Sequence, residues 1–202
     1  MNEGNILADV PVAHVEANFA DMYTLQNNLQ ARLNQLPLVL DYKHMANKCV
    51  YWGHCVRAET EELIEWLVNL SEPTALKEMQ MEAIDIVHFV FNIGIEIGLT
   101  CDSVHFLEID YEHQNWEVDP QRIRATTLML GTAVNNLINL LPWKTWKTYH
   151  NDPNLAAVGD AFNQVLRANL MLCNACGLDR QAVINMYYAK NKVNHARQDN
   201  GY

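Results

Sequence analysis

Residues 81–99 read MEAIDIVHFVFNIGIEIGL, and this stretch decides the fold class. At about 100° per residue, its polar members fall within roughly one third of a helix circumference. These members are Glu82, Asp85, His88, Asn92 and Glu96. The remaining circumference is apolar, which predicts a helix buried on most sides. Its polar strip is expected to face either water or a site.

The first half of the chain divides into three predicted helices. They are expected at residues 15–36, 42–70 and 74–97. Pro37 ends the first, since proline cannot continue a helix. Gly98 is suited to the left-handed residue that follows the third.

The second half continues with helices. Thr100 is expected to cap a short helix, and Asp119-Pro120 and Asp152-Pro153 each join a capping carboxylate to a proline suited to the first turn. Gly177 ends the sixth helix and Asp179 caps the last. No longer stretch alternates apolar and polar residues as a strand would. We therefore expect one all-α domain over residues 1–202, a helical bundle with antiparallel neighbours.

Composition excludes some function classes. The formal net charge is −10 and no run of Lys and Arg occurs, so a nucleic-acid partner is not expected. The most apolar stretch, residues 83–99, contains three acidic or amide side chains and a histidine, which makes it a poor membrane span. The first residues lack the pattern of a secretory signal. We expect a cytoplasmic protein, in which the lone CxxC of Cys173 and Cys176 supplies small core residues.

The predicted second helix contains RAETEELIEWL at residues 57–67. An apolar stripe at alternating spacings of three and four runs through Cys49, Trp52, Val56, Leu63, Trp66 and Leu70. Glu59 stands inside that stripe, where a carboxylate needs a cation or hydrogen bonds. Glu62 is its neighbour on the helix surface three residues on. The alternative interpretation is a solvated glutamate face.

Two carboxylate pairs stand on adjacent predicted helices. The ExxE pair is Glu59 and Glu62, and the ExxD pair is Glu82 and Asp85. Helices joined by a short turn run antiparallel, so the four groups can converge. Hard oxygen ligands in that number suit Mg²⁺ or Mn²⁺. A di-iron bundle would instead need two Glu-x-x-His pairs, and only Asp85-x-x-His88 comes close.

Four blocks of sequence carry a resemblance to a known family. They are LQARLN at 29–34, WGHCVRAETEELIE at 52–65, EAIDIVHF at 82–89 and YAKNKVNHARQDNGY at 188–202. The chain resembles the all-α dimeric dUTPases, which are related to MazG-like pyrophosphohydrolases and to phage dCTPase/dUTPases. The last block is the most specific of the four, and residues 100–180 match weakly.

The resemblance implies an activity and a set of site residues. Mg²⁺, with Mn²⁺ as a substitute, would be held by Glu59, Glu62, Glu82 and Asp85, and Glu62 and Glu59 would act on a water that attacks the α-phosphorus of dUTP. The products would be dUMP and pyrophosphate. The residues expected to bind the deoxypyrimidine triphosphate are Gln30, Asn34, Trp52, Lys190, Asn191, Asn194, Arg197, Gln198 and Tyr202. A homodimer and a mobile cap region at about 100–180 are also implied.

One departure from the family pattern leaves the base open. The family often carries a Trp/Lys-rich tract soon after the ExxE block, and here NLSEPTALKE occupies that place. A similar tract, WKTWK, stands at residues 143–147. It is interpreted either as a substitute for the missing tract or as an amphipathic turn. The substrate is accordingly dUTP, dCTP or both, and a helical interaction protein without catalysis remains the alternative class.

Overall fold

The computed structural model describes residues 17–33, 42–104, 118–144, 147–149 and 153–199. Its elements are α1 (Phe19–Leu33), α2 (Tyr42–Val68), α3 (Ala75–Glu96), the 3₁₀ helix η3 (Cys101–Val104), α5 (Pro120–Leu140), α6 (Leu155–Ala175) and α7 (Arg180–Asp199). No strand occurs within these ranges, so the all-α prediction is confirmed. Among the same residues, no helix has the length and apolar character needed to cross a membrane.

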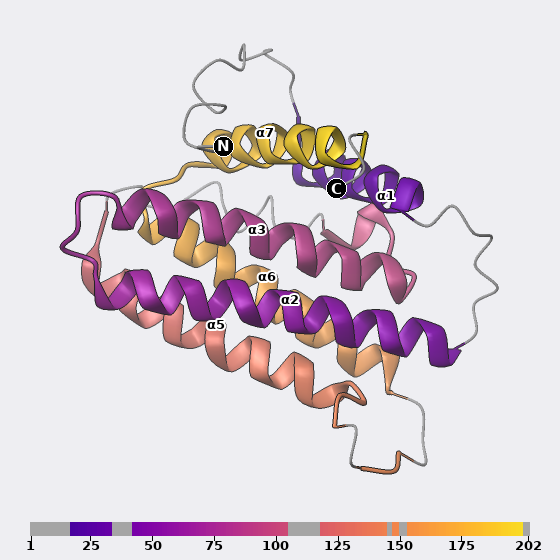
Figure 1. The fold of residues 1–202 in the computed structure, drawn as a ribbon. Coiled ribbons are helices and arrows are strands. Elements are labelled where there is room, and N and C mark those ends of the chain that lie inside the picture. Colours follow the sequence, from indigo (N-terminus) through magenta and orange to yellow (C-terminus); the bar gives the residue numbers. More distant parts are fainter. Residues whose placement is uncertain (1–16, 34–41, 105–117, 145–146, 150–152, 200–202) are drawn as a thin grey trace.

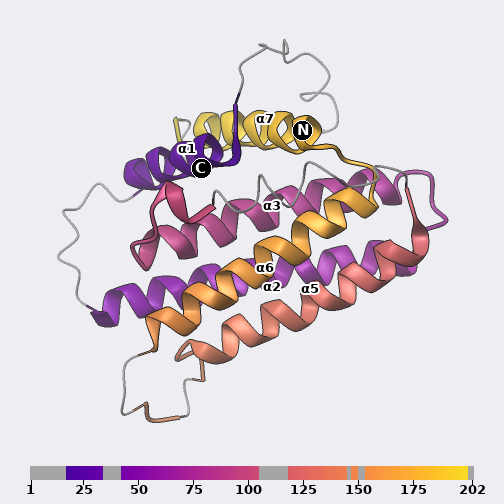
Figure 2. The same ribbon diagram turned by 180° about the vertical axis from the view of Figure 1, so that it is seen from behind.

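The helices form two layers. Four long helices, α2, α3, α5 and α6, make a bundle in which α2 packs most extensively on α3 and α5 on α6 (Figure 1). The shorter helices α1 and α7 lie side by side across α3, and both views show them on the same side of the bundle (Figures 1 and 2). α3 is therefore covered by α2, α6 and the α1–α7 layer within one chain.

Most helix ends follow the predicted signals. The Asp119 carboxylate accepts hydrogen bonds from the backbone N–H groups of Gln121 and Arg122 at 2.9 and 3.2 Å, and Asp179 accepts one from Ala182 at 2.7 Å. Gly98 and Gly177 both take a φ of 79°, a left-handed conformation that glycine adopts without strain. These side chains and glycines fix where α3, α5, α6 and α7 begin or end.

The start of α6 differs from the prediction. Asn154 caps the helix and accepts hydrogen bonds from the N–H groups of Ala156 and Ala157 at 3.1 and 3.2 Å. Asp152 lies outside the described residues. Either side chain can cap a helix, and the backbone starts α6 directly after Asn154.

Most of the polar strip of α3 is shielded from water. His88 and Asn92 are 3% exposed and Glu96 is 5% exposed, because α1 and α7 cover them. The apolar remainder of α3 packs into the core, where Ile84, Val87 and Phe91 are buried. The strip therefore faces the seam between the bundle and the α1–α7 layer.

The described helices within residues 100–180 contribute to the bundle itself. α5 and α6 bring Leu130, Leu137, Phe162 and Val165 into the shared core. Cys173 and Cys176 are buried there too, which confirms the interpretation of the CxxC as core. The surface of these two helices carries exposed apolar side chains: Leu128, Met129, Leu140, Leu155 and Met171.

We predict opposite stability effects for two helical glycines. A Cβ at Gly94 would lie 2.7 Å from Phe162 Cε2 and 2.9 Å from Tyr23 Oη, so Gly94→Ala should lower the free energy of unfolding by about 1–3 kcal/mol. A Cβ at Gly131 would meet nothing within 4 Å, so Gly131→Ala should raise it by about 0.5–1 kcal/mol. Urea denaturation of both variants measures this. Equal effects would contradict the close packing at Gly94.

Candidate active site

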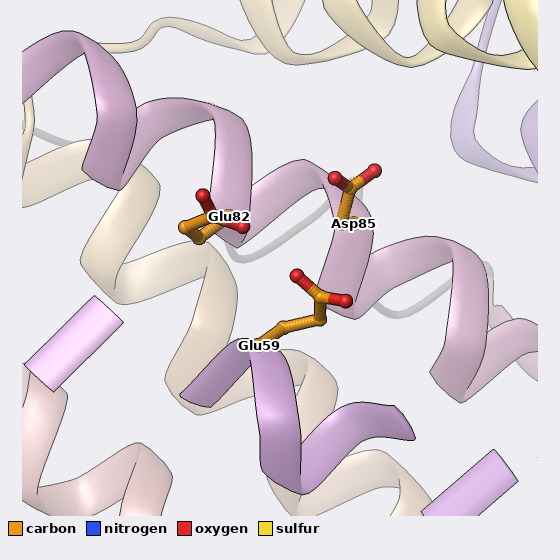
Figure 3. A group of neighbouring side chains, drawn as sticks. All are labelled: Glu59, Glu82 and Asp85. Atoms are coloured by element: carbon orange, nitrogen blue, oxygen red, sulfur yellow. The ribbon is translucent and has the colours of Figure 1, made fainter. Parts of the chain in front are cut away.

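Three carboxylates meet where α2 faces α3. Glu59 comes from α2, and Glu82 and Asp85 come from α3 (Figure 3). One oxygen of each lies within 4.8 Å of the others, and all three side chains are half-buried. Glu59 reaches this point because it interrupts the apolar stripe of α2 that packs on α3.

Burial and mutual repulsion make the charged forms of these carboxylates unfavourable, and Lys190 offsets only part of that cost. Burial raises the pKa of Glu59, although a hydrogen bond with Glu82 opposes the rise. Burial, the same hydrogen bond and the charges of Glu59 and Asp85 raise the pKa of Glu82 to about 9. The Glu59–Glu82 pair therefore favours sharing a proton over carrying two charges. Clustered carboxylates in this condition fit a hard divalent cation, whose charge would replace that proton.

The fourth predicted ligand lies apart from the other three. Glu62 is exposed, and it is not within the group of oxygens formed by Glu59, Glu82 and Asp85. Its charge nevertheless contributes to the raised pKa of Glu59 and of Glu82. The structure therefore brings three of the four carboxylates together and keeps Glu62 at the edge.

Cationic and amide groups of α7 lie beside the cluster. Lys190 Nζ is 2.8 Å from Asp85 Oδ2. Lys190, Asn194 and Arg197 all line one cavity of about 320 Å³, which Glu59 and Asp85 also line. That volume is within the range of small-molecule sites. A chain with a net charge of −10 thus places one cation at the acidic cluster and a second in the same cavity.

Another part of the cavity wall is aromatic and polar. Trp52 and Phe89 line it, and their rings stack with centroids 5.9 Å apart. Gln26, His88 and Asn92 line it as well. Flat aromatic faces and a few amide or imidazole groups suit a planar ligand with hydrogen-bonding edges.

The polar groups of this wall form one network. Gln26 Oε1 is 2.8 Å from His88 Nδ1 and accepts a hydrogen bond from the Tyr187 hydroxyl at 2.8 Å. Gln26 Nε2 donates to Asn92 Oδ1 at 2.7 Å. Burial and the charge of Lys190 lower the pKa of His88 to about 3, although a hydrogen bond with the Tyr187 backbone opposes the fall, so the His88 ring is neutral. Since Gln26 Oε1 can only accept, His88 carries its proton on Nδ1.

Two polar atoms of the wall have no hydrogen-bond partner among the described residues. They are Trp52 Nε1, a donor, and His88 Nε2, an acceptor in the Nδ1–H tautomer. Both atoms are buried, and both residues line the cavity. An unsatisfied buried polar group is costly, so a ligand that offers one acceptor and one donor would satisfy both.

Several predicted substrate residues lie elsewhere. Gln30 is buried and donates to Glu96 Oε1, which also pairs with Lys48 at 3.3 Å, and Gln30 does not line the cavity. Asn191 is buried and does not line it either. Asn34, Tyr202 and the Gln198 side chain lie outside the described residues. The structure therefore brings Trp52, Lys190, Asn194 and Arg197 of the predicted set to the cavity.

Sequence reasoning missed Gln26, Phe89 and Asn92 as cavity residues. Gln26 lies one helical turn before Gln30 on the same face of α1, and Asn92 belongs to the polar strip of α3. The position of Gln26 one turn before Gln30 and that of Asn92 in the polar strip are the sequence signals that could have identified these two residues. Of the WKTWK tract, the structure describes Trp143, Lys144 and Lys147, and none of these three lines the cavity; Trp143 packs edge-on against His54.

Comparison with known proteins gives one match. A family model described as dUTPase matches residues 18–202, which is most of the chain. No match was found among curated proteins or among solved structures. The matched range contains every cavity residue and all three clustered carboxylates.

We predict that the metal-free protein loses stability as pH rises. The folded pKa of Glu82 is raised above its ordinary 4.5, so folding stability is fully present below that value and falls as pH rises through about 9. Glu82→Gln should make the free energy of unfolding, measured in EDTA, depend less on pH. Mg²⁺ should stabilise the native protein more than the variant.

Glu61→Gln is the matched control for this experiment. Glu61 is exposed on α2 and pairs with Arg57 at 3.1 Å, away from the cluster. The Glu61→Gln variant should show the same dependence of unfolding free energy on pH as the native protein. A native stability that is flat from pH 5 to 9 in EDTA would contradict the raised pKa of Glu82.

Proposed function

The chain belongs to the all-α dUTPase family, and from this premise we propose that it is an Mg²⁺-dependent enzyme that hydrolyses dUTP to dUMP and pyrophosphate. Family membership supports hydrolysis of a deoxynucleoside triphosphate as the general activity. The observation that carries the proposal is the convergence of Glu59, Glu82 and Asp85 beside a cavity with cationic and aromatic walls. A solvated acidic face would have no reason to half-bury three carboxylates together.

In this proposal Glu59, Glu82 and Asp85 hold the metal, with Mn²⁺ as a substitute. When bound, Mg²⁺ supplies positive charge to the triphosphate and lowers the pKa of a coordinated water. Glu62, exposed and one turn along α2, is the proposed general base for water attack on the α-phosphorus, with Glu59 assisting.

Lys190 and Arg197 are proposed to offset the phosphate charges. Both line the cavity on α7, seven residues and about two turns apart, so they share one face. Asn194 lies between them on that face and offers a donor to phosphate or sugar. Dispersed charge in a phosphoryl transition state is stabilised by donors placed in this way.

The unpartnered atoms of the wall support uracil as the base. Uracil offers N3–H between two carbonyl oxygens, whereas cytosine offers an N3 acceptor beside an amino group. His88 Nε2 would accept from uracil N3–H, and Trp52 Nε1 would donate to a carbonyl oxygen. Cytosine would place the lone pair of N3 against that of His88 Nε2. We therefore place dUTP ahead of dCTP or mixed use.

A homodimer in the cytoplasm remains part of the proposal. The apolar surface of α3 is covered within one chain, so it does not supply a dimer interface. Exposed Leu128, Met129 and Met171 border a groove between α5 and α6, and they are the candidate surface for a second copy.

The deciding experiment is turnover of each deoxynucleoside triphosphate. With Mg²⁺ we expect pyrophosphate and dUMP from dUTP, and weaker release from dCTP, dTTP, dATP and dGTP. EDTA should abolish turnover and Mn²⁺ should restore it. Absence of turnover with every nucleotide in both metals would favour a helical interaction protein instead.

We predict that Lys190→Met lowers kcat/KM for dUTP by about 10²-fold or more, because one phosphate-facing cation is lost. Steady-state kinetics at saturating Mg²⁺ measures the change. Lys192→Met is the matched control, since Lys192 is exposed on the same helix and does not line the cavity. An equal loss in both variants would argue against a role for Lys190 in the site.

A further inference from the structure

Tyr187 lies behind the cavity wall and has no contact with the cavity itself. It is 0% exposed in α7, and it is not among the residues that line the cavity. Its ring stacks on His88 with centroids 4.0 Å apart and an interplanar angle of 11°. Its hydroxyl donates to Gln26 Oε1. A residue in this position can influence a bound base only through Gln26 and His88.

Gln26, His88 and Asn92 form a chain of hydrogen bonds, here called the relay. Its polarity is the direction in which each of these hydrogen bonds runs from donor to acceptor. The Gln26 amide oxygen faces Tyr187 and His88, and the amide nitrogen faces Asn92. This orientation fixes His88 with Nε2 as an acceptor. It also fixes Asn92 with Oδ1 occupied, so that Nδ2 is the donor that Asn92 can offer to the cavity. Two residues that line the cavity therefore have one free acceptor, His88 Nε2, and one donor, Asn92 Nδ2, which is the pair that the edge of uracil requires.

The same hydrogen bonds of the relay could also form with every donor and acceptor exchanged. If the Gln26 amide turned over, its nitrogen would donate to His88 Nδ1, and His88 would carry its proton on Nε2. Asn92 would then donate to the Gln26 oxygen and present Oδ1 to the cavity. The cavity would show a donor and an acceptor in exchanged places. That pattern matches cytosine, whose N3 accepts and whose amino group donates.

The Tyr187 hydroxyl distinguishes the two polarities. In the observed one, its O–H has an acceptor in Gln26 Oε1 at 2.8 Å. In the inverted one, Gln26 presents an amide nitrogen, which cannot accept, and the hydroxyl hydrogen would be buried without a partner. Burying an unsatisfied donor is unfavourable, so the hydroxyl holds the amide in the uracil orientation.

We propose that Tyr187 is a positioning residue that determines base specificity, by fixing the polarity of the Gln26–His88–Asn92 relay for uracil against cytosine. The inference rests on the proposed function, because it assumes that a pyrimidine binds in this cavity. It adds to that function a residue that the base never touches.

Tyr187→Phe tests the proposal, since it removes the hydroxyl and keeps the ring stacked on His88. We expect the ratio of kcat/KM for dUTP to that for dCTP to fall roughly tenfold to a hundredfold. The value for dCTP should rise, which a merely structural loss would not produce. An unchanged ratio in Tyr187→Phe would overturn the proposal.

Tyr23→Phe is the matched control. Tyr23 is also buried and also packs on Phe91, but its hydroxyl donates to the Leu99 carbonyl at 3.0 Å, outside the relay. It should lose stability like Tyr187→Phe and keep the native ratio. A fall in the ratio as large as that of Tyr187→Phe would assign the effect to core packing and overturn the proposal.

The ¹⁵N spectrum of His88 supplies a readout that is independent of turnover. In the native protein, Nδ1 should show the shift of a protonated nitrogen and Nε2 that of an unprotonated one. Tyr187→Phe should add a population with the proton on Nε2, and a native His88 protonated on Nε2 would overturn the relay. If the native protein hydrolysed no nucleotide, the proposed function would fail, while this spectrum would still decide whether Tyr187 sets the tautomer.

Discussion

Half-burial of three carboxyl groups at one point is the constraint on which the rest of the structure depends. Glu59, Glu82 and Asp85 lose hydration where α2 faces α3, and the pKa values of both glutamates rise in consequence. Such a group is stable only with protons, cations or donors at hand. Lys190 supplies one cation from a distant part of the sequence. The remaining demand for positive charge is what makes the cluster a metal centre in this account.

The two-layer architecture turns that cluster into a site with walls. The bundle is held by apolar contacts, whereas the α1–α7 layer meets α3 through polar groups as well: Gln26 with His88 and Asn92, and Lys190 with Asp85. The hydrogen bonds of amide and imidazole groups in such a seam have a fixed direction, since each group has a donor end and an acceptor end. The seam can therefore both close the cavity and discriminate among ligands of the same shape.

The sequence was sufficient to predict the fold class and the centre of the site. A helix cap such as Asp119 depends only on neighbouring residues, so the sequence predicts it. Glu59 stands within an apolar stripe, and that position predicts its burial. The site residues that the sequence did not predict depend on how the helices cross. Gln26 and Gln30 share a face of α1, and only the crossing of α1 over α3 places Gln26 at His88 and Gln30 at Glu96. Glu62 lies about 60° around the axis from Glu59, which suffices to turn it to solvent.

Diffraction from crystals grown with Mn²⁺ and an α,β-imido analogue of dUTP would locate both the metal, through its anomalous scattering, and the nucleotide. We expect Mn²⁺ among Glu59, Glu82 and Asp85, with the α-phosphate adjacent and the uracil edge at His88 and Trp52. A cation bound elsewhere, or a nucleotide outside this cavity, would contradict this expectation.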